Sequence, residues 1–251
     1  MHDERDRAES FGAIAEAYDL NRPAYPDELI DDLLRPEPET VLDIATGTGK
    51  AAGPFLERGL QVVGVEPDEA MAAIARRHGV DVEIARFEDW DPRGRRFDLI
   101  TCAHAWHWLD PSAKDRIPEL LRPGGVIARF WIYHVFEPDV VDALDAVYAD
   151  LPASIHRFGH DPSGDPEPPD PLADVPGLTV LPSRTYRWSG SLTTDQWTRR
   201  IATFSDHQRL GAEELAVLQH RVAGVIDRFG GAVVTQYGVL CLLAQRAGTA
   251  Q

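Results

Sequence analysis

The fold is decided by one stretch of sequence, Val41-Leu42-Asp43-Ile44-Ala45-Thr46-Gly47-Thr48-Gly49. Its first five residues form a short and mainly apolar run, which predicts a buried strand. The two glycines predict a tight turn into a helix, because glycine adopts backbone conformations that other residues avoid. At such a turn a ligand can approach the backbone, and the first amide groups of the helix are free to bind it. The stretch therefore predicts a strand, a ligand-binding turn and a helix, in that order.

The same alternation continues toward the C-terminus. Short apolar runs predict further strands at 61–65, 82–85, 97–102 and 126–131. Amphipathic patterns between them predict helices near 50–58, 68–78 and 111–121. Strands that alternate with helices form right-handed βαβ units and a parallel sheet. The central part of the chain is therefore expected to have an α/β fold.

Other patterns flank this central part. Helices are expected around Tyr18, over 138–148, after the capping box that Thr193 forms with Gln196, and over the stretch that ends at Gly230. A closing strand is expected at 233–243. The many prolines of 151–176 predict an irregular segment, which is either a lid over a site or a surface insertion.

The composition limits the classes of partner. The 251 residues carry a formal net charge of −16, and affinity for nucleic acids comes mostly from cationic contacts to phosphate, so no nucleic-acid partner is expected. The first residues are charged, and no stretch has the roughly eighteen continuous apolar residues of a membrane helix, so no membrane partner is expected. Cys102 and Cys241 are too few for a disulfide framework. Together these features predict a cytoplasmic protein.

The glycine-rich turn alone does not identify its ligand. Gly47-x-Gly49-x-x-Ala52 also fits the dinucleotide-binding pattern, which would indicate an NAD-linked oxidoreductase. Asp43 argues against that ligand, because a carboxylate at this position suits an ammonium group and offers nothing to a pyrophosphate. Glu66 ends the second expected strand, where an acid can accept hydrogen bonds from both hydroxyls of a ribose.

Together these features resemble the class I S-adenosylmethionine (SAM)-dependent methyltransferases. The resemblance is carried by 41–49, by 66–71 at the end of the second strand, and by 121–125 before the fifth. Within the family, the chain is most similar to the trans-aconitate methyltransferase-like and UbiE-like small-molecule enzymes, through 11–26, 103–108 and 203–207. One departure is Ala45-Thr46, which replaces the Gly-Cys or Gly-Ser usually found there.

The resemblance implies a Rossmann-like fold with a mostly parallel seven-stranded sheet, an antiparallel last strand and helices on both faces. It also implies helical additions at the N-terminus and after the fifth strand. The chain would then be a single methyltransferase domain, 1–251. Its expected parts are an N-terminal helical cap at 1–36 and a SAM-binding core at 37–135. Substrate-side helices with the proline-rich insertion would follow at 136–210, and a last helix with the closing strand at 211–251.

The resemblance also implies where SAM would lie. It assigns the methionine part to Asp43, Gly47 and Gly49, with Arg22 as a candidate for the carboxylate. Glu66 would bind the ribose. Met71 would pack on the adenine, and Phe87 with Glu88 would lie at its edge. His104 with Ala105 would lie near the sulfonium, and Tyr18 would cover it. Core packing for Tyr18 and Met71, and a surface ion pair for Arg22, remain as alternatives.

The expected reaction is methylation of a small molecule, with S-adenosylhomocysteine (SAH) as the second product. O-methylation is favoured, with a slight preference for a carboxylate acceptor. C- or N-methylation, and SAM binding without methylation, remain as alternatives. A carboxylate needs no general base, whereas a hydroxyl, an amine or an acidic carbon usually does.

The candidates for such a base are the histidines, with His107 and His104 in the first place and His134 and His207 after them. The spacing His104-x-x-His107 lacks the further ligands of a metal site, so no metal is expected. Aromatic residues that hint at a flat or apolar acceptor are Trp106, Trp108, Trp131 and Trp188. Arginines that would suit a carboxylate are Arg129, Arg184, Arg187, Arg199 and Arg200. The oligomeric state is not predicted.

Overall fold

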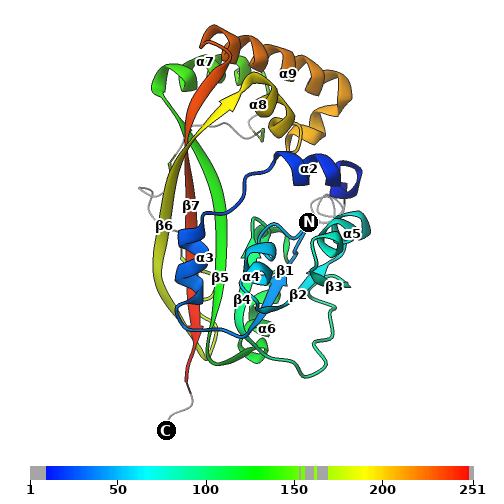
Figure 1. Cartoon of the computed structure of the whole chain (residues 1–251), viewed down its shortest axis with the longest axis vertical. Coiled ribbons are helices and arrows are strands. Elements are labelled where there is room, and N and C mark those ends of the chain that lie inside the picture. The colour runs from blue at the N-terminus through cyan, green and yellow to red at the C-terminus, as the bar shows by residue number, and fades with distance from the viewer. Residues whose placement is uncertain (1–9, 153, 156–160, 163–168, 249–251) are drawn as a thin grey trace.

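A seven-stranded sheet in the order β3-β2-β1-β4-β5-β7-β6 runs the length of the protein (Figure 1). The computed structural model describes residues 10–152, 154–155, 161–162 and 169–248. The strands are β1 (Thr40–Ile44), β2 (Gln61–Glu66), β3 (Asp81–Ile84), β4 (Phe97–Ala103), β5 (Leu121–Phe136), β6 (Leu178–Thr193) and β7 (Ala232–Arg246). Strands β1 to β5 pair in parallel, whereas β7 is antiparallel to both β5 and β6. The predicted Rossmann-like α/β fold is confirmed.

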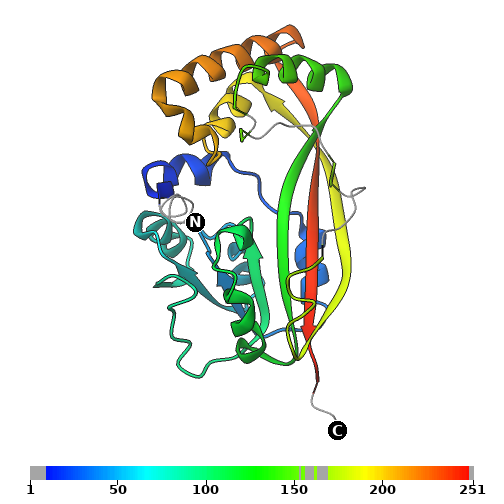
Figure 2. The same ribbon diagram turned by 180° about the vertical axis from the view of Figure 1, so that it is seen from behind.

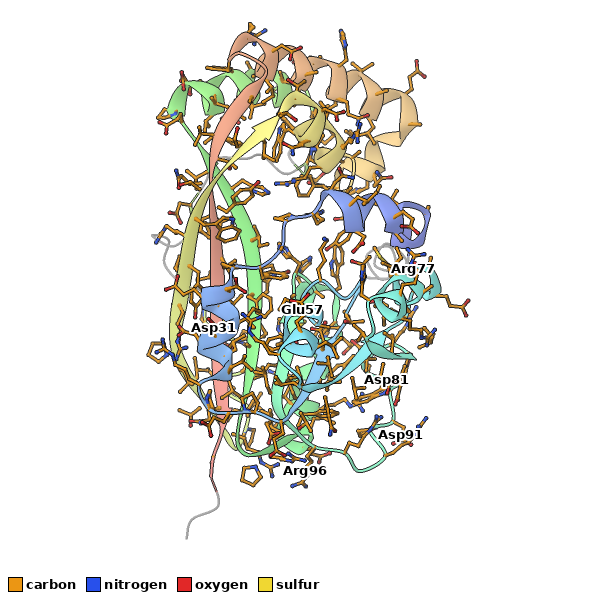
Figure 3. The ribbon with its side chains drawn as sticks, viewed as in Figure 1. Asp31, Glu57, Arg77, Asp81, Asp91 and Arg96 are labelled. Carbon is orange, nitrogen blue, oxygen red and sulfur yellow. The ribbon has the colours of Figure 1, made fainter. Side chains whose placement is uncertain are left out.

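Helices cover both faces of the parallel part because side chains alternate along each strand. Val41 of β1 packs in one apolar cluster with α3 (Asp27–Leu34), α4 (Gly53–Glu57) and α5 (Glu69–Arg77). Leu42 and Ile44 pack on the other face with α6 (Ala113–Leu120). The outward faces of these elements carry charge, and Figure 3 shows Glu57 and Arg77 pointing away from the core.

The strands β5, β6 and β7 extend well past the parallel part and carry a second group of helices (Figures 1 and 2). We call α7 (Pro138–Tyr148), α8 (Thr194–Ile201), η4 (His207–Leu210), α9 (Gly211–Arg228) and the residues 202–206 the cap. Phe136, Trp197 and Val222 belong to its apolar core. The predicted capping box is present at the start of α8, where the Thr193 side chain accepts from the Gln196 amide.

The N-terminal segment lies between the cap and the sheet. It consists of η1 (Ser10–Ile14), α2 (Ala15–Asn21) and the following residue Arg22, and α2 contacts both α5 and α8. Asp68 fixes one end, because its carboxylate accepts from the Gly12 amide at 2.9 Å while it caps α5. At the other end, Arg200 of α8 donates to the carbonyl of Asn21 at 2.8 Å.

Some boundaries differ from the predictions, and one strand was not predicted. Helix α4 begins at Gly53 rather than near residue 50, because the turn with positive φ at Ala45, Gly47 and Gly49 takes up more of the chain. Strand β5 continues to Phe136, past the expected end at 131. Strand β6 was not predicted by position, because only alternate residues of this edge strand face the core and a register shift between Leu181 and Arg184 interrupts the pattern.

The proline-rich segment is described only in part, since 153, 156–160 and 163–168 lie outside the described residues. Ile155 is buried near the cap, and Leu172 and Val175 are buried on the α6 face of the sheet. The ends of the segment are therefore packed against the protein. Both cysteines are free and buried, in β4 and β7. Across the described ranges, no helix combines the length and the apolar character needed to cross a bilayer.

Candidate active site

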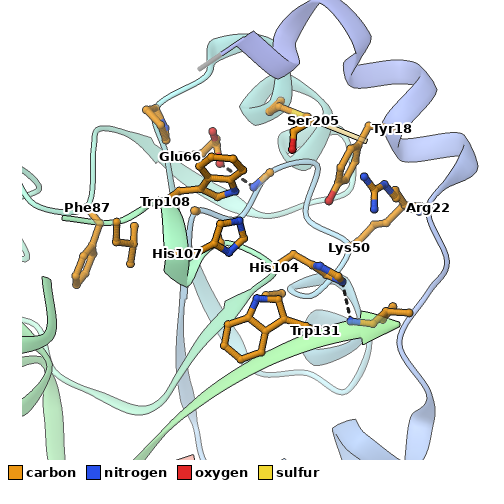
Figure 4. A pocket seen from close by; sticks show the side chains of 18 of the residues that line it. Tyr18, Arg22, Lys50, Glu66, Phe87, His104, His107, Trp108, Trp131 and Ser205 are labelled. Carbon is orange, nitrogen blue, oxygen red and sulfur yellow. Dashed lines mark hydrogen bonds between the residues drawn. The ribbon is translucent and has the colours of Figure 1, made fainter. Parts of the chain in front are cut away.

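A cavity of about 1360 Å³ opens at the carboxyl ends of the parallel strands, beneath the cap and beside α2 (Figure 4). This is the edge at which open α/β sheets bind ligands. Nine of the eleven predicted cofactor residues line it, namely Tyr18, Arg22, Gly47, Glu66, Met71, Phe87, Glu88, His104 and Ala105, and so does His107. Asp43 and Gly49 are not among its lining residues.

Gly47 and Glu66 form the centre of one half of the cavity. The Gly47 amide donates to Oε2 of Glu66 at 2.8 Å, and the Asp68 amide donates to Oε1 at 3.0 Å. The carboxylate is only 5% exposed, and this burial raises the pKa of Glu66 to about 7. A Cβ on Gly47 would meet no protein atom within 4 Å. The backbone at Gly47 therefore borders open space next to a fixed carboxylate.

Asp43 and Gly49 support this turn from behind. Asp43 is 1% exposed, and its two oxygens accept from the hydroxyls of Thr46 and Thr101 at 2.5 and 2.7 Å. Burial raises the pKa of Asp43 to about 6. A Cβ on Gly49 would lie 3.0 Å from the Val80 side chain. Both residues are thus explained by the shape of the turn, and their predicted contact with a ligand stays a prediction.

Aromatic and apolar residues line the end of the cavity next to Glu66. Phe87 is 2% exposed and Met71 is 4% exposed, so both present packed surfaces. Oε1 of Glu88 accepts from the Asp110 amide at 2.5 Å and so holds the loop that precedes α6. These residues provide a flat apolar site beside the Glu66 carboxylate.

Two cations line the opposite side of the same half, Arg22 and Lys50 (Figure 4). Nε and Nη2 of Arg22 donate to the hydroxyl and the carbonyl of Thr203, each at 2.9 Å. The Arg22 guanidinium also lies 4.0 Å from the centre of the Phe204 ring. Burial lowers the pKa of Arg22 below its ordinary value. Lys50 was not predicted as a site residue, although it directly follows the glycine-rich stretch.

His104 is held in one orientation and one charge state. Its φ is 56°, in a region that side chains other than glycine rarely occupy. Its Nε2 accepts from the Ile132 amide at 2.8 Å, so the neutral ring carries its hydrogen on Nδ1. Burial lowers the pKa of His104 to about 3, with further lowering by Arg22 and His107. His104 is therefore a fixed neutral residue at the end of β4, and its Nε2 is not available to accept a proton.

His107 lies in the short helix η2 (Trp106–Trp108), with its ring 4.4 Å from the Trp108 ring. It is exposed and lines the cavity. In contrast, His207 is fully buried and does not line the cavity. His134 lines the cavity from β5.

The other half of the cavity lies between β5 and the cap. Residues that line it include Trp108, Trp131, Tyr133, Ile155, Phe204, Ser205 and Asp206. Trp106 lies under the Arg129 guanidinium and Trp188 stacks on Tyr237, so neither lines the cavity. The five arginines suggested for a carboxylate, from Arg129 to Arg200, do not line it either.

Tyr133, Ser205 and Asp206 were missed as site residues by the sequence analysis, although it had marked the segment 203–207. In the described part of the chain, no three His, Cys, Asp or Glu side chains are grouped as a metal site would require.

The chain is similar to known methyltransferases in sequence. The sequence model of a family described as a methyltransferase domain matches residues 18–131. An uncharacterized methyltransferase of Mycobacterium tuberculosis is 38% identical over 131 residues, which cover 51% of this chain and 54% of that protein. A ubiquinone biosynthesis O-methyltransferase of Bradyrhizobium sp. (strain ORS 278) is 35% identical over 169 residues, covering 64% of this chain and 55% of that protein. The chain thus spans about half the length of these curated relatives.

The fold is also shared with solved structures. The structure of a candidate type II methyltransferase from Anaeromyxobacter dehalogenans has a TM-score of 0.67 and is 22% identical, covering 90% of this chain and 99% of that one. The predicted seven-stranded sheet with an antiparallel last strand is present in this chain. Residues 18–131 thus match a methyltransferase domain, and the chain shares the Rossmann-like fold of that solved methyltransferase structure.

Proposed function

We propose that the protein transfers the methyl group of SAM to an oxygen atom of a small molecule. The observation that carries this proposal is the single continuous cavity that joins the Gly47–Glu66 region to the aromatic region beneath the cap. Its volume of about 1360 Å³ exceeds the roughly 300–1,000 Å³ of most ligand sites, so a cofactor and an acceptor fit together.

The first half of the cavity fits SAM in its chemistry. The open space at Gly47 allows a ligand to approach the backbone, and Glu66 offers a carboxylate to the ribose hydroxyls. Phe87 and Met71 provide an apolar site for the adenine. Arg22 or Lys50 would hold the carboxylate of the methionine part, because each presents a cation to the cavity. Tyr18 would cover the sulfonium from α2.

When bound, SAM supplies a methyl group that its positively charged sulfur has already activated. The residues of this chain then need to hold the acceptor in line with that group and to exclude water. Such positioning contributes up to roughly 7–11 kcal/mol to lowering a barrier. The N-terminal segment and the segment 203–206 of the cap enclose the cavity on the side opposite the sheet, and the Arg22–Thr203 hydrogen bonds join them.

The charges of the acceptor half favour a hydroxyl over a carboxylate. The slight preference for a carboxylate came from the resemblance to trans-aconitate methyltransferase-like enzymes, and the five arginines that would suit a carboxylate do not line the cavity. The charged residue that the cap contributes to the lining is Asp206, which would repel a carboxylate. An acceptor that carries a hydrogen on its reacting oxygen therefore suits this half better. A small alcohol or phenol has this property, and C- or N-methylation remains the second possibility.

The proposed function is tested by calorimetry and by SAH release. We expect SAM and SAH to bind and NAD not to bind, because the Asp43 carboxylate behind the turn would repel a pyrophosphate. Release of SAH in the presence of a panel of small alcohols and phenols would support methyl transfer. Binding of NAD in preference to SAM would contradict the proposal, and SAM binding without SAH release from any acceptor would favour a non-methylating protein.

A further inference from the structure

A series of three hydrogen-bonded residues leads from the core of the cap to the cavity. The hydroxyl of Tyr148 in α7 lies 3.0 Å from Nε2 of His207, and Nδ1 of His207 lies 2.9 Å from Oδ1 of Asp206. Tyr148 is 1% exposed and His207 is 0% exposed, so these two residues are shielded from water. The third residue, Asp206, lines the cavity, and its side chain is 14% exposed.

The Asp206 carboxylate fixes the direction of one of these hydrogen bonds. A carboxylate only accepts, so Nδ1 of His207 carries the hydrogen that it donates to Asp206. When the ring is neutral, its lone pair lies on Nε2 and accepts from the Tyr148 hydroxyl. Burial keeps that hydroxyl protonated, because it raises the pKa of Tyr148 well above its ordinary value. The His207 amide also donates to Oδ1 of Asp206 at 2.9 Å, so the carboxylate is held in position by two bonds.

Asp206 lines the cavity close to Arg22. The Arg22 guanidinium bonds to Thr203 and lies over the Phe204 ring, in the segment that leads to Asp206, and Asp206 interacts electrostatically with it. Arg22 is one of the two cations proposed to hold the methionine part of SAM, and the sulfonium belongs to that part. The acceptor would then lie between this region and the aromatic residues Trp131 and Phe204, within reach of Asp206.

We propose that Asp206 binds the hydroxyl of the methyl acceptor and takes its proton, while His207 and Tyr148 position the carboxylate. This inference rests on the proposed function and names its acceptor class as a small phenol. As the acceptor oxygen gains the methyl group and the bond from that group to sulfur breaks, the hydroxyl hydrogen passes to Asp206. The cofactor loses its positive charge, Asp206 loses its negative charge, and the proton later leaves to solvent. Asp206 is then the catalytic residue, and His207 and Tyr148 are positioning residues.

The test measures the binding of phenol, benzylamine and benzoate by NMR titration, with and without saturating SAH. Phenol should bind at least tenfold more tightly than benzoate, because a charge-assisted hydrogen bond replaces a like-charge contact. The Asp206→Asn variant should lose this difference, because its amide carries no charge. The matched control is Asp195→Asn, which makes the same change at an exposed position on α8 away from the cavity and should keep it. Tyr148→Phe should reduce the preference by about fivefold, the effect of one neutral hydrogen bond.

A second measurement separates positioning from folding. The ¹⁵N spectrum of His207 should show a neutral ring with its hydrogen on Nδ1, and this signature should be lost in Asp206→Asn. Benzoate bound as tightly as phenol, or a preference that survives Asp206→Asn, would overturn the inference. Benzylamine bound more tightly than phenol would overturn the hydroxyl assignment in favour of an amine. Failure of SAH to bind would instead overturn the proposed function, and the titrations without SAH would still test Asp206.

Discussion

Arg22 of the N-terminal segment donates two hydrogen bonds to Thr203 of the cap, 181 residues away in the chain. One guanidinium therefore joins the two parts that enclose the cavity, and the same guanidinium lines the cavity. Arg22 therefore has two possible effects on ligand binding, which removal of its side chain would change together. One is the closure of the cavity, and the other is the proposed binding of the cofactor carboxylate.

The role of Arg22 in binding can be measured with two ligands. We expect Arg22→Gln to weaken SAH binding by more than tenfold, because an ion pair to the carboxylate is lost. The same variant should bind methylthioadenosine, which lacks the carboxylate, within about threefold of the original affinity. Calorimetry with both ligands is the measurement, and Lys50→Gln is the comparison. If Lys50→Gln shows the selective loss instead, Lys50 holds the carboxylate.

The affinity for SAH should depend on pH through Glu66. Its pKa is raised to about 7 in the ligand-free protein, and the ribose hydroxyls donate to the charged form. Below pH 7 a proton must leave Glu66 for the ligand to bind, so affinity should fall by up to about tenfold per pH unit. Above pH 7 it should be level. Calorimetry between pH 5.5 and 8.5 tests this, and Glu66→Gln should bind weakly with a flat profile. A flat profile in the unsubstituted protein would contradict the assignment.

The two glycines of the turn should respond differently to alanine. At Gly47 the added Cβ points into open space at the cavity, so Gly47→Ala should weaken SAH binding strongly. Its stability should fall by about 1 kcal/mol, the cost of a positive φ for alanine. At Gly49 the Cβ meets Val80 and Ala75, and Gly49→Ala should destabilise the fold more than that. Denaturant unfolding and calorimetry measure the two effects. If affinity for SAH fell in proportion to stability in both variants, the predicted difference between Gly47 and Gly49 would be contradicted.

His104 should remain neutral throughout the physiological range. Its pKa is lowered to about 3, whereas an unfolded histidine titrates near its ordinary value of 6.5. The unfolded state therefore binds one more proton between these values, and stability is lost as pH falls through them, by at most about 1.4 kcal/mol per unit. NMR titration should show no shift of the His104 ring above pH 4. In His104→Asn this part of the acid destabilisation should be absent, and asparagine tolerates the positive φ. Titration of His104 near pH 6 would contradict the structure.

The sequence predicted the parallel core well because its strands are buried on both faces and read as continuous apolar runs. The burial of four of the five residues of β1 shows why the signal was strong. Strand β6 gave a weak signal, since it lies at the sheet edge and most of its residues are partly or fully exposed. The end of β5 was also missed, because polar residues such as His134 are buried there beneath the cap.

The half of the cavity at Gly47 and Glu66 could be located from local sequence, because Glu66 ends one strand of the core and Gly47 lies just after another. The acceptor half could not, because Tyr133 and Asp206 come together only through the packing of the cap on β5. The predicted contact of Asp43 with a ligand stays a prediction. A carboxylate in a strand indicates a ligand from sequence alone, whereas the structure gives it two threonine hydroxyls as partners.

The pairing of β5 with β7 runs without a register shift from Val126–Gln245 to Phe136–Thr235, and so from the core into the cap. Bending the cap away from the sheet would require this ladder to break several hydrogen bonds at once. Release of the N-terminal segment breaks no strand pairing. It requires the loss of side-chain bonds at Arg22, Arg200 and Asp68, together with the ion pairs of Glu16 and Asp19 and the packing of Ala15 on α5. Exchange of ligands should therefore follow the local unfolding of the first helices. Its rate would then be set by residues that take no part in choosing the acceptor, so that turnover and selectivity can be altered by separate substitutions.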